Sequence, residues 1–148
     1  MSREIKFRVW DKISYSMLYQ DDFERVELDT KNKMVTLIAE EESDKSHYVL
    51  DYEDGIEAEI MQYTGLKNNN DGTELYEGDI LESPLWEGEP YEIVFKDQAF
   101  KARDIRKKIV HDSDLFFTLD DLLSGCAGDT FKVIGNIYEN PELLEGER

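Results

Sequence analysis

Few residues in this chain could hold a metal ion or act as a nucleophile. It has two histidines, His47 and His111, and one cysteine, Cys126, so no disulfide can form within the chain. His111 precedes Asp112, a dipeptide also found in metal-dependent phosphohydrolases, but those sites draw on several more histidine and aspartate ligands. Cys126 has no histidine or arginine beside it in the sequence that would activate a thiolate. We therefore predict no metal site and no nucleophilic cysteine.

Calcium and nucleotide motifs are also missing. An EF-hand loop aligned on Gly72 would place Lys67 at the first ligand position and Gly78 at the position of the final glutamate, and both are incompatible with calcium. No glycine spacing forms a dinucleotide fingerprint or a phosphate loop. Carboxylate pairs such as Asp120 and Asp121 are expected by chance among 35 acids, and they become catalytic only where burial separates their pKa values. We predict no cofactor, no catalytic residues and no enzymatic activity.

The charge of the chain is large and unevenly distributed. Thirty-five acids against 17 bases give a formal net charge of −18, which repels nucleic-acid phosphates on average. The segment Asp71–Glu92 contains eight acids and no base, whereas Phe95–His111 contains six bases and two acids. Both segments are either solvated faces or complementary patches for a partner or for a second copy.

The segment between Trp86 and Lys108 supplies the candidate interface residues. Aromatic side chains in a loop-rich segment are costly to expose and are favoured at interfaces, and bases next to an acidic stretch suit head-to-tail contact between copies. The candidates are Trp86, Tyr91, Lys101, Arg103, Arg106, Lys107 and Lys108. We expect a homo-oligomer from this pattern. The alternative is that the two charged stretches pair across a hairpin within one chain.

Runs of alternating apolar and polar residues predict a series of short strands. They are Glu4–Trp10, Met17–Tyr19, Met34–Ile38, His47–Tyr52, Asp79–Glu82, Tyr91–Lys96, Phe100–Asp104 and Phe131–Tyr138. Ile109–Val110 is predicted as an extension of this set. Ile56–Tyr63 fits a helix or a strand equally well, and Leu115–Ser124 fits a short helix that stops at Gly125.

The strongest turn signal, Asn68–Gly72, places a boundary in the middle of the chain. We expect an N-terminal β-rich subdomain at residues 1–66 and a barrel-like subdomain at residues 67–148. Gly135, inside an apolar strand, predicts a β-bulge or close backbone packing, and Tyr76 is expected to bury its ring. No window approaches the length of a membrane helix and the N-terminus is unlike a signal peptide, so we expect a cytoplasmic protein.

Three blocks of sequence resemble the YopX family of phage and prophage proteins. They are Ile5–Asp11, then Met61–Lys67 running on to Tyr76–Ile80, and finally Val133–Leu144. The resemblance implies a phage or prophage protein acting in the bacterial cytoplasm. It also implies a mainly β (α+β) fold whose C-terminal half is an SH3-like barrel with one short helix. It assigns no catalytic residues.

From these observations we rank three candidate functions for the chain. The first is a non-enzymatic accessory protein, an acidic protein-binding or assembly module with a host or phage protein as partner. The second is a nucleic-acid-binding module that uses the basic residues within 96–108, although the charge elsewhere opposes it. The third is an enzyme that acts through carboxylates.

Overall fold

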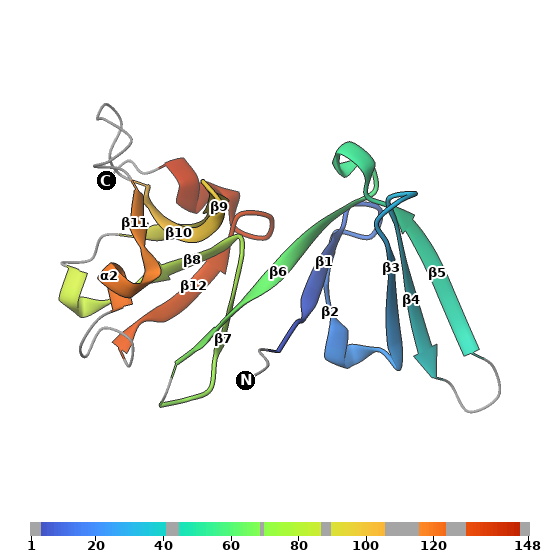
Figure 1. Ribbon diagram of the computed structural model, residues 1–148, viewed down its shortest axis with the longest axis horizontal. Coiled ribbons are helices and arrows are strands. Elements are labelled where there is room, and N and C mark those ends of the chain that lie inside the picture. The colour runs from blue at the N-terminus through green and yellow to red at the C-terminus, as the bar shows by residue number, and fades with distance from the viewer. Residues whose placement is uncertain are drawn as a thin grey trace. The chain divides into compact units, whose positions relative to one another are not determined.

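The computed structural model describes residues 4–40, 45–68, 70–86, 90–105, 116–123 and 130–145 (Figure 1). Its strands form curled antiparallel sheets, so the predicted mainly β fold with a short helix is confirmed. Contacts divide the chain into two compact units, Glu4–Gln62 and the chain from Tyr63 onward. The predicted division into a subdomain at residues 1–66 and a subdomain at residues 67–148 stays a prediction.

The first unit contains two groups of antiparallel strands. In one, β1(Phe7–Asp11) lies between β2(Ser16–Tyr19) and β6(Ala58–Lys67). In the other, β4(Met34–Glu40) lies between β3(Arg25–Asp29) and β5(Lys45–Asp51). The buried apolar residues that form the core of this unit are Val9, Val35, Leu37, Leu50 and Ala58.

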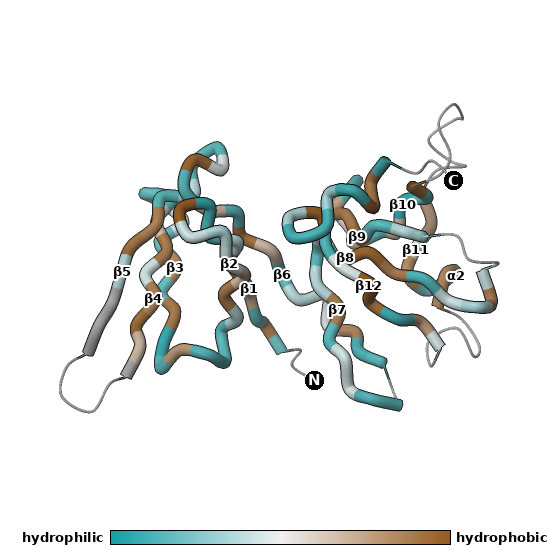
Figure 2. Tube along the Cα trace, turned by 180° about the vertical axis from the view of Figure 1, so that it is seen from behind, coloured by the Kyte–Doolittle hydropathy of each residue, from teal (hydrophilic) through white to brown (hydrophobic). Residues whose placement is uncertain are grey.

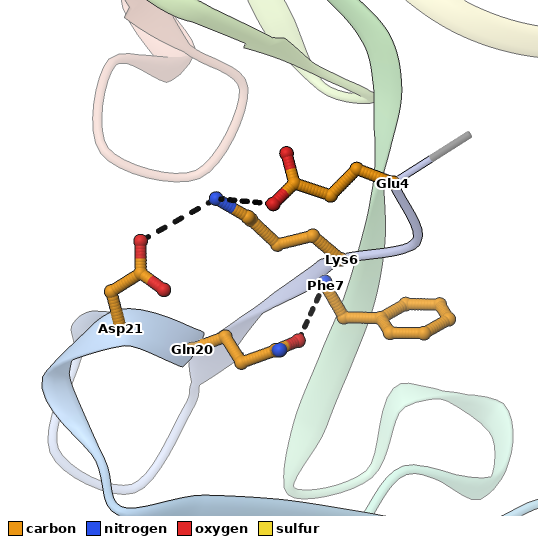
Figure 3. A network of polar contacts seen from close by, with 5 residues as sticks. All are labelled: Glu4, Lys6, Phe7, Gln20 and Asp21. Atoms are coloured by element: carbon orange, nitrogen blue, oxygen red, sulfur yellow. Dashed lines mark hydrogen bonds and ion pairs between the residues drawn. The ribbon is translucent and has the colours of Figure 1, made fainter. Parts of the chain in front are cut away.

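A polar network fixes the start of β1 (Figure 3). The Lys6 ammonium lies 3.4 Å from Asp21 and 3.6 Å from Glu4, and the Phe7 N–H donates to Gln20 Oε1 at 3.2 Å. Gln20 and Asp21 belong to the 3-10 turn η1(Gln20–Asp22) that follows β2. Lys6 is buried, and a buried ammonium requires such partners. These contacts give Lys6 and Phe7, at the start of the sequence block Ile5–Asp11, a structural role.

The second unit is built around a five-stranded sheet in the order β11-β10-β9-β8-β12. Its elements are β7(Glu74–Tyr76), β8(Asp79–Glu82), η3(Pro84–Trp86), β9(Tyr91–Lys96), β10(Ala99–Asp104), β11(Phe116–Thr118), α2(Leu119–Leu123), β12(Lys132–Asn136) and η4(Pro141–Glu145). Its buried core residues are Leu75, Leu81, Tyr91, Ile93, Ala102, Leu122 and Phe131. Hydrophobic stretches follow the strands of each unit, as Figure 2 shows.

The ambiguous segment Ile56–Tyr63 contributes to a strand, β6. Residues 58–62 of β6 pair with β1, whereas Tyr63 and Lys67 pair with Tyr76 and Glu74 of β7. The division between the units therefore falls inside one continuous strand. The Thr64 hydroxyl donates to the Leu75 carbonyl at 2.8 Å, which supports the irregular second half of this pairing.

The bulge predicted at Gly135 is confirmed. The register between β12 and β8 shifts between Val133 and Gly135. A Cβ at position 135 would collide with the side chain of Asn140, whose Oδ1 accepts a hydrogen bond from the Asn136 N–H at 3.1 Å. Glycine is required here because a neighbouring side chain occupies the space, not because of an unusual φ.

Three strands were not predicted, namely β3, β7 and β11, and the predicted extension at Ile109–Val110 lies outside the described residues. The helix predicted at Leu115–Ser124 was wrong for Phe116–Thr118, which form β11, and the described helix is α2 at Leu119–Leu123. Among the helices that the structure describes, none has both the length and the apolar character that crossing a membrane requires.

Candidate interaction surface

The basic side chains of the β9–β10 hairpin already have partners within the chain. Arg103 lies opposite Glu92 in the strand register, and its Nη2 donates to Glu92 Oε1 at 2.6 Å. The Lys101 ammonium lies 3.7 Å from Asp97, and the Lys96 ammonium lies 4.8 Å from the centre of the Phe116 ring. The Glu92–Arg103 pair joins the acidic and basic stretches across a hairpin of one chain, which was the alternative to contact between copies. Self-association stays a prediction.

The two aromatic candidates pack inside the second unit. Tyr91 is 7 % exposed and belongs to the hydrophobic core. Its ring meets Trp86 edge-on at a centroid distance of 5.3 Å and Phe117 at 5.8 Å. Intrachain packing therefore accounts for both aromatics, and we leave Trp86 and Tyr91 out of the surface proposed below.

The other candidates of that segment, Arg106, Lys107 and Lys108, lie outside the described residues, as do His111 and Cys126. In the part of the chain that the structure does describe, no group of three or more histidine, cysteine or acidic side chains is placed to hold a metal ion.

Two exposed carboxylates have pKa values that turn geometry lowers. At Asp29, the hydrogen bond from the Asn32 N–H has the larger effect and that from the Asn32 side-chain amide the smaller. Both stabilise the charged form of Asp29 and lower its pKa. The Thr73 N–H, with the Thr73 hydroxyl, lowers the pKa of Asp71 in the same way. A general acid working near neutral pH needs the opposite shift. These two carboxylates therefore serve the turns and are not suited to act as general acids.

We expect Asp71→Asn to reduce stability near neutral pH but not in strong acid. Because the folded pKa of Asp71 lies below the ordinary value of 3.8, its stabilising effect is present above that value and is lost as the pH falls through the folded pKa. Thermal melts from pH 2 to 7 measure this. Glu142→Gln, which removes the same charge from an exposed position, is the control. A difference between the two variants that persists at pH 2 would contradict this prediction.

The turn between β1 and β2 presents apolar side chains to solvent. The buried Asp11 carboxylate builds this turn: Oδ1 accepts from the Ile13 and Ser14 N–H groups at 2.9 and 3.3 Å, and Oδ2 accepts from the Ser14 hydroxyl at 2.7 Å. Ile13 is 64 % exposed and Tyr15 is 78 % exposed. Tyr15 has a φ of 56°, a left-handed conformation that is strained for a bulky residue and is a reason to look for function.

The turn between β5 and β6 presents a third apolar side chain. It is closed by its own hydrogen bonds: the Asp51 N–H donates to Glu57 Oε1 at 2.8 Å, and the Glu57 N–H donates to the Asp51 carbonyl at 2.9 Å. Gly55 is buried with a φ of +70°, which favours glycine. Ile56, next in the chain, is 63 % exposed. Figure 2 shows a hydrophobic stretch within this otherwise hydrophilic turn.

The two turns adjoin one another. The Lys12 N–H donates to the Glu57 carbonyl at 2.9 Å, and the Lys12 ammonium lies 3.4 Å from Glu59. Both turns lie at the same end of the first unit (Figure 1). We call Ile13, Tyr15 and Ile56 with the exposed acids Glu53 and Asp54 the apolar turn surface. Isolated exposed apolar residues need no explanation, but three on adjoining hydrogen-bonded turns suit an interface.

Sequence patterns did not identify this surface. Isoleucine and tyrosine are usually buried or half-buried, so their types alone do not predict exposure. The available signal at Ile13 was position, because it stands among polar residues outside the alternation of a strand. Ile56 continues the alternation of Ala58 and Ile60, so the pattern carries no signal of its exposure.

Comparison with known proteins shows which family this chain belongs to. The family profile described as YopX protein matches residues 6–145. The crystal structure of protein EF1440 from Enterococcus faecalis is similar, with 30 % identity and a TM-score of 0.58 over 97 % of this chain and 99 % of that one. The crystal structure of YopX from Bacillus subtilis shares the fold, with 22 % identity and a TM-score of 0.62 over 93 % and 96 % of the two chains. A comparison with curated proteins found no match.

Proposed function

The chain belongs to the YopX family, and from this premise we propose that it is a non-enzymatic binding module that recognises a protein partner through the apolar turn surface. The setting that we propose is the cytoplasm of a bacterium that carries a phage or prophage, where the chain acts as an accessory protein. The exposure of Ile13, Tyr15 and Ile56 on adjoining turns is the observation that carries the proposal.

The size and rigidity of these side chains support this function. Burying a large apolar side chain contributes about 1.5–3 kcal/mol, and tyrosine is among the residues most often found to dominate binding energy. The carboxylate of Asp11 and the closed turn at Asp51–Glu57 hold the surface in place before a partner arrives. A preformed surface loses less conformational entropy on binding than a mobile one.

Nucleic-acid binding has less support from the described residues. Lys101 and Arg103 are paired with Asp97 and Glu92, so a phosphate would have to compete with carboxylates already in place. The net charge of −18 adds repulsion at longer range. The apolar turn surface offers exposed apolar side chains to a protein partner, whereas Lys101 and Arg103 are already paired and are poorly suited to bind a phosphate.

We expect Tyr15→Gly to weaken partner binding strongly without loss of stability. Glycine adopts a positive φ at no steric cost, so the thermal midpoint should stay the same or rise. Removing a central tyrosine from an interface typically costs about 2 kcal/mol or more, which is roughly 30-fold in affinity. Affinity capture from a host lysate, quantified by mass spectrometry, identifies the partner, and calorimetry with the purified partner measures the loss.

Gln98→Gly is the matched control, because Gln98 also has a positive φ, 70°, but lies in the β9–β10 hairpin. This variant should keep full affinity. If Tyr15→Gly lowered the thermal midpoint while every captured protein still bound, Tyr15 would be a structural residue and the proposal would be wrong.

A further inference from the structure

We infer that the partner of the apolar turn surface is a basic protein segment that carries aliphatic side chains among its lysines or arginines. This inference rests on the proposed function and adds the chemistry of the partner. It depends on charges around Ile13, Tyr15 and Ile56 that the binding proposal itself does not need.

The charges around the surface are mainly negative. The segment Asp51–Glu59 contains five carboxylates and no base. Glu53 and Asp54 are exposed, and they stand just before Gly55 and Ile56 in the same turn. A partner that covers Ile56 must therefore bring its own charges close to these two carboxylates.

Two lysines lie near this segment and do not reverse its sign. Lys12 lies 3.4 Å from Glu59, so it neutralises one carboxylate. Lys33 is held near Tyr52 by its own carbonyl, which accepts from the Tyr52 N–H at 2.9 Å. Acids therefore outnumber bases around the apolar side chains, and a positively charged partner is favoured over a neutral or acidic one.

The same charges disfavour the other occupants of an exposed apolar surface. A second copy of this chain would bring a net charge of −18 to an acidic surface. An anionic membrane would be repelled by Glu53 and Asp54 as Ile56 approached it. Of the three, a basic segment is the occupant that can bury the apolar side chains and pair with the carboxylates at once.

Three synthetic twelve-residue peptides test this inference on the full chain. The first carries four lysines or arginines around two leucines in a serine–glycine background. The second replaces the basic residues by glutamate, and the third replaces the leucines by serine. Nitrogen-15 NMR titration locates binding on the protein, and fluorescence anisotropy measures the dissociation constants at two salt concentrations.

We expect only the first peptide to shift the amide signals of residues 12–15 and 53–57, with at least tenfold tighter binding than either comparison peptide. Glu53→Gln combined with Asp54→Asn should weaken it by roughly three- to tenfold and reduce its salt dependence. Both changes suit the fold, because glutamine keeps the size of the exposed Glu53 side chain and asparagine tolerates the positive φ of Asp54.

Three outcomes would overturn the inference. Equal binding of the glutamate peptide at the same amides would show that the surface binds apolar segments without regard to charge, and the proposed function would still stand. Equal binding of the serine peptide would show general attraction of cations by an acidic protein. If no peptide shifts these amides, the inference fails, while the effect of Tyr15→Gly on capture decides the proposed function separately.

Discussion

Replacing Tyr76 by alanine is expected to unfold much of the second unit at temperatures where the parent chain is folded. Tyr76 is 3 % exposed, lies opposite Tyr63 in the register of β6 and β7, and its ring centroid is 5.5 Å from that of Tyr63. Losing a buried aromatic side chain costs about 3–5 kcal/mol. For a unit of this size, 1 kcal/mol corresponds to a shift of about 4–8 °C in the thermal midpoint.

Circular dichroism melts of Tyr76→Ala and Tyr76→Phe measure this effect. Phenylalanine keeps the ring, so it should retain most of the stability and show how much of the loss is due to packing. An unchanged midpoint for Tyr76→Ala would mean that the ring is not part of the core.

Gly135→Val should also destabilise the second unit strongly. The new side chain would collide with Asn140. Overpacking typically costs about 1–3 kcal/mol, and displacing Asn140 would also break its hydrogen bond with the Asn136 N–H, worth roughly 1 kcal/mol. Urea denaturation followed by fluorescence is a suitable measurement, with Gly135→Ala as the milder member of the series.

A second substitution tests the cause of this loss. If the collision with Asn140 is responsible, Gly135→Ala should cost less stability in an Asn140→Gly background than in the parent chain. An equal cost in both backgrounds would show that the glycine is needed for the backbone of the bulge itself.

The sequence was informative where apolar residues alternate over a whole strand. Met34–Ile38 and Tyr91–Lys96 were predicted on that pattern, and β4 and β9 are there. β3 was missed although Val26 and Leu28 alternate with charged residues, because this short strand contains only two apolar residues. β7 has three residues, too few for periodicity to be recognised. β11 lies within Leu115–Ser124, whose apolar residues recur at helical spacing, so its residues were predicted as part of a helix.

Burial of charged residues and exposure of apolar ones both depend on distant elements. Alternation placed Arg8 in the predicted strand Glu4–Trp10 but did not indicate its burial. Arg8 is buried, and its guanidinium lies 5.9 Å from the centre of the Tyr19 ring. The turns that carry Ile13 and Ile56 adjoin because the ladder of β1 and β6 continues through Lys12 and Glu57. Neither relation is local in the sequence, so neither the buried cation nor the candidate surface could be predicted from it.

The continuous strand β6 has a consequence for how this protein can be cut or recombined. Domains are usually joined by an exposed linker, where proteases cleave and gene fusion is tolerated. Here the division between Gln62 and Tyr63 falls in a strand that pairs with β1 on one side of the division and with β7 on the other. A protease would have to pull a paired strand out of its ladder, and a crossover between two related genes at this point would build the single strand β6 from two different parents. The two units should therefore be inherited together.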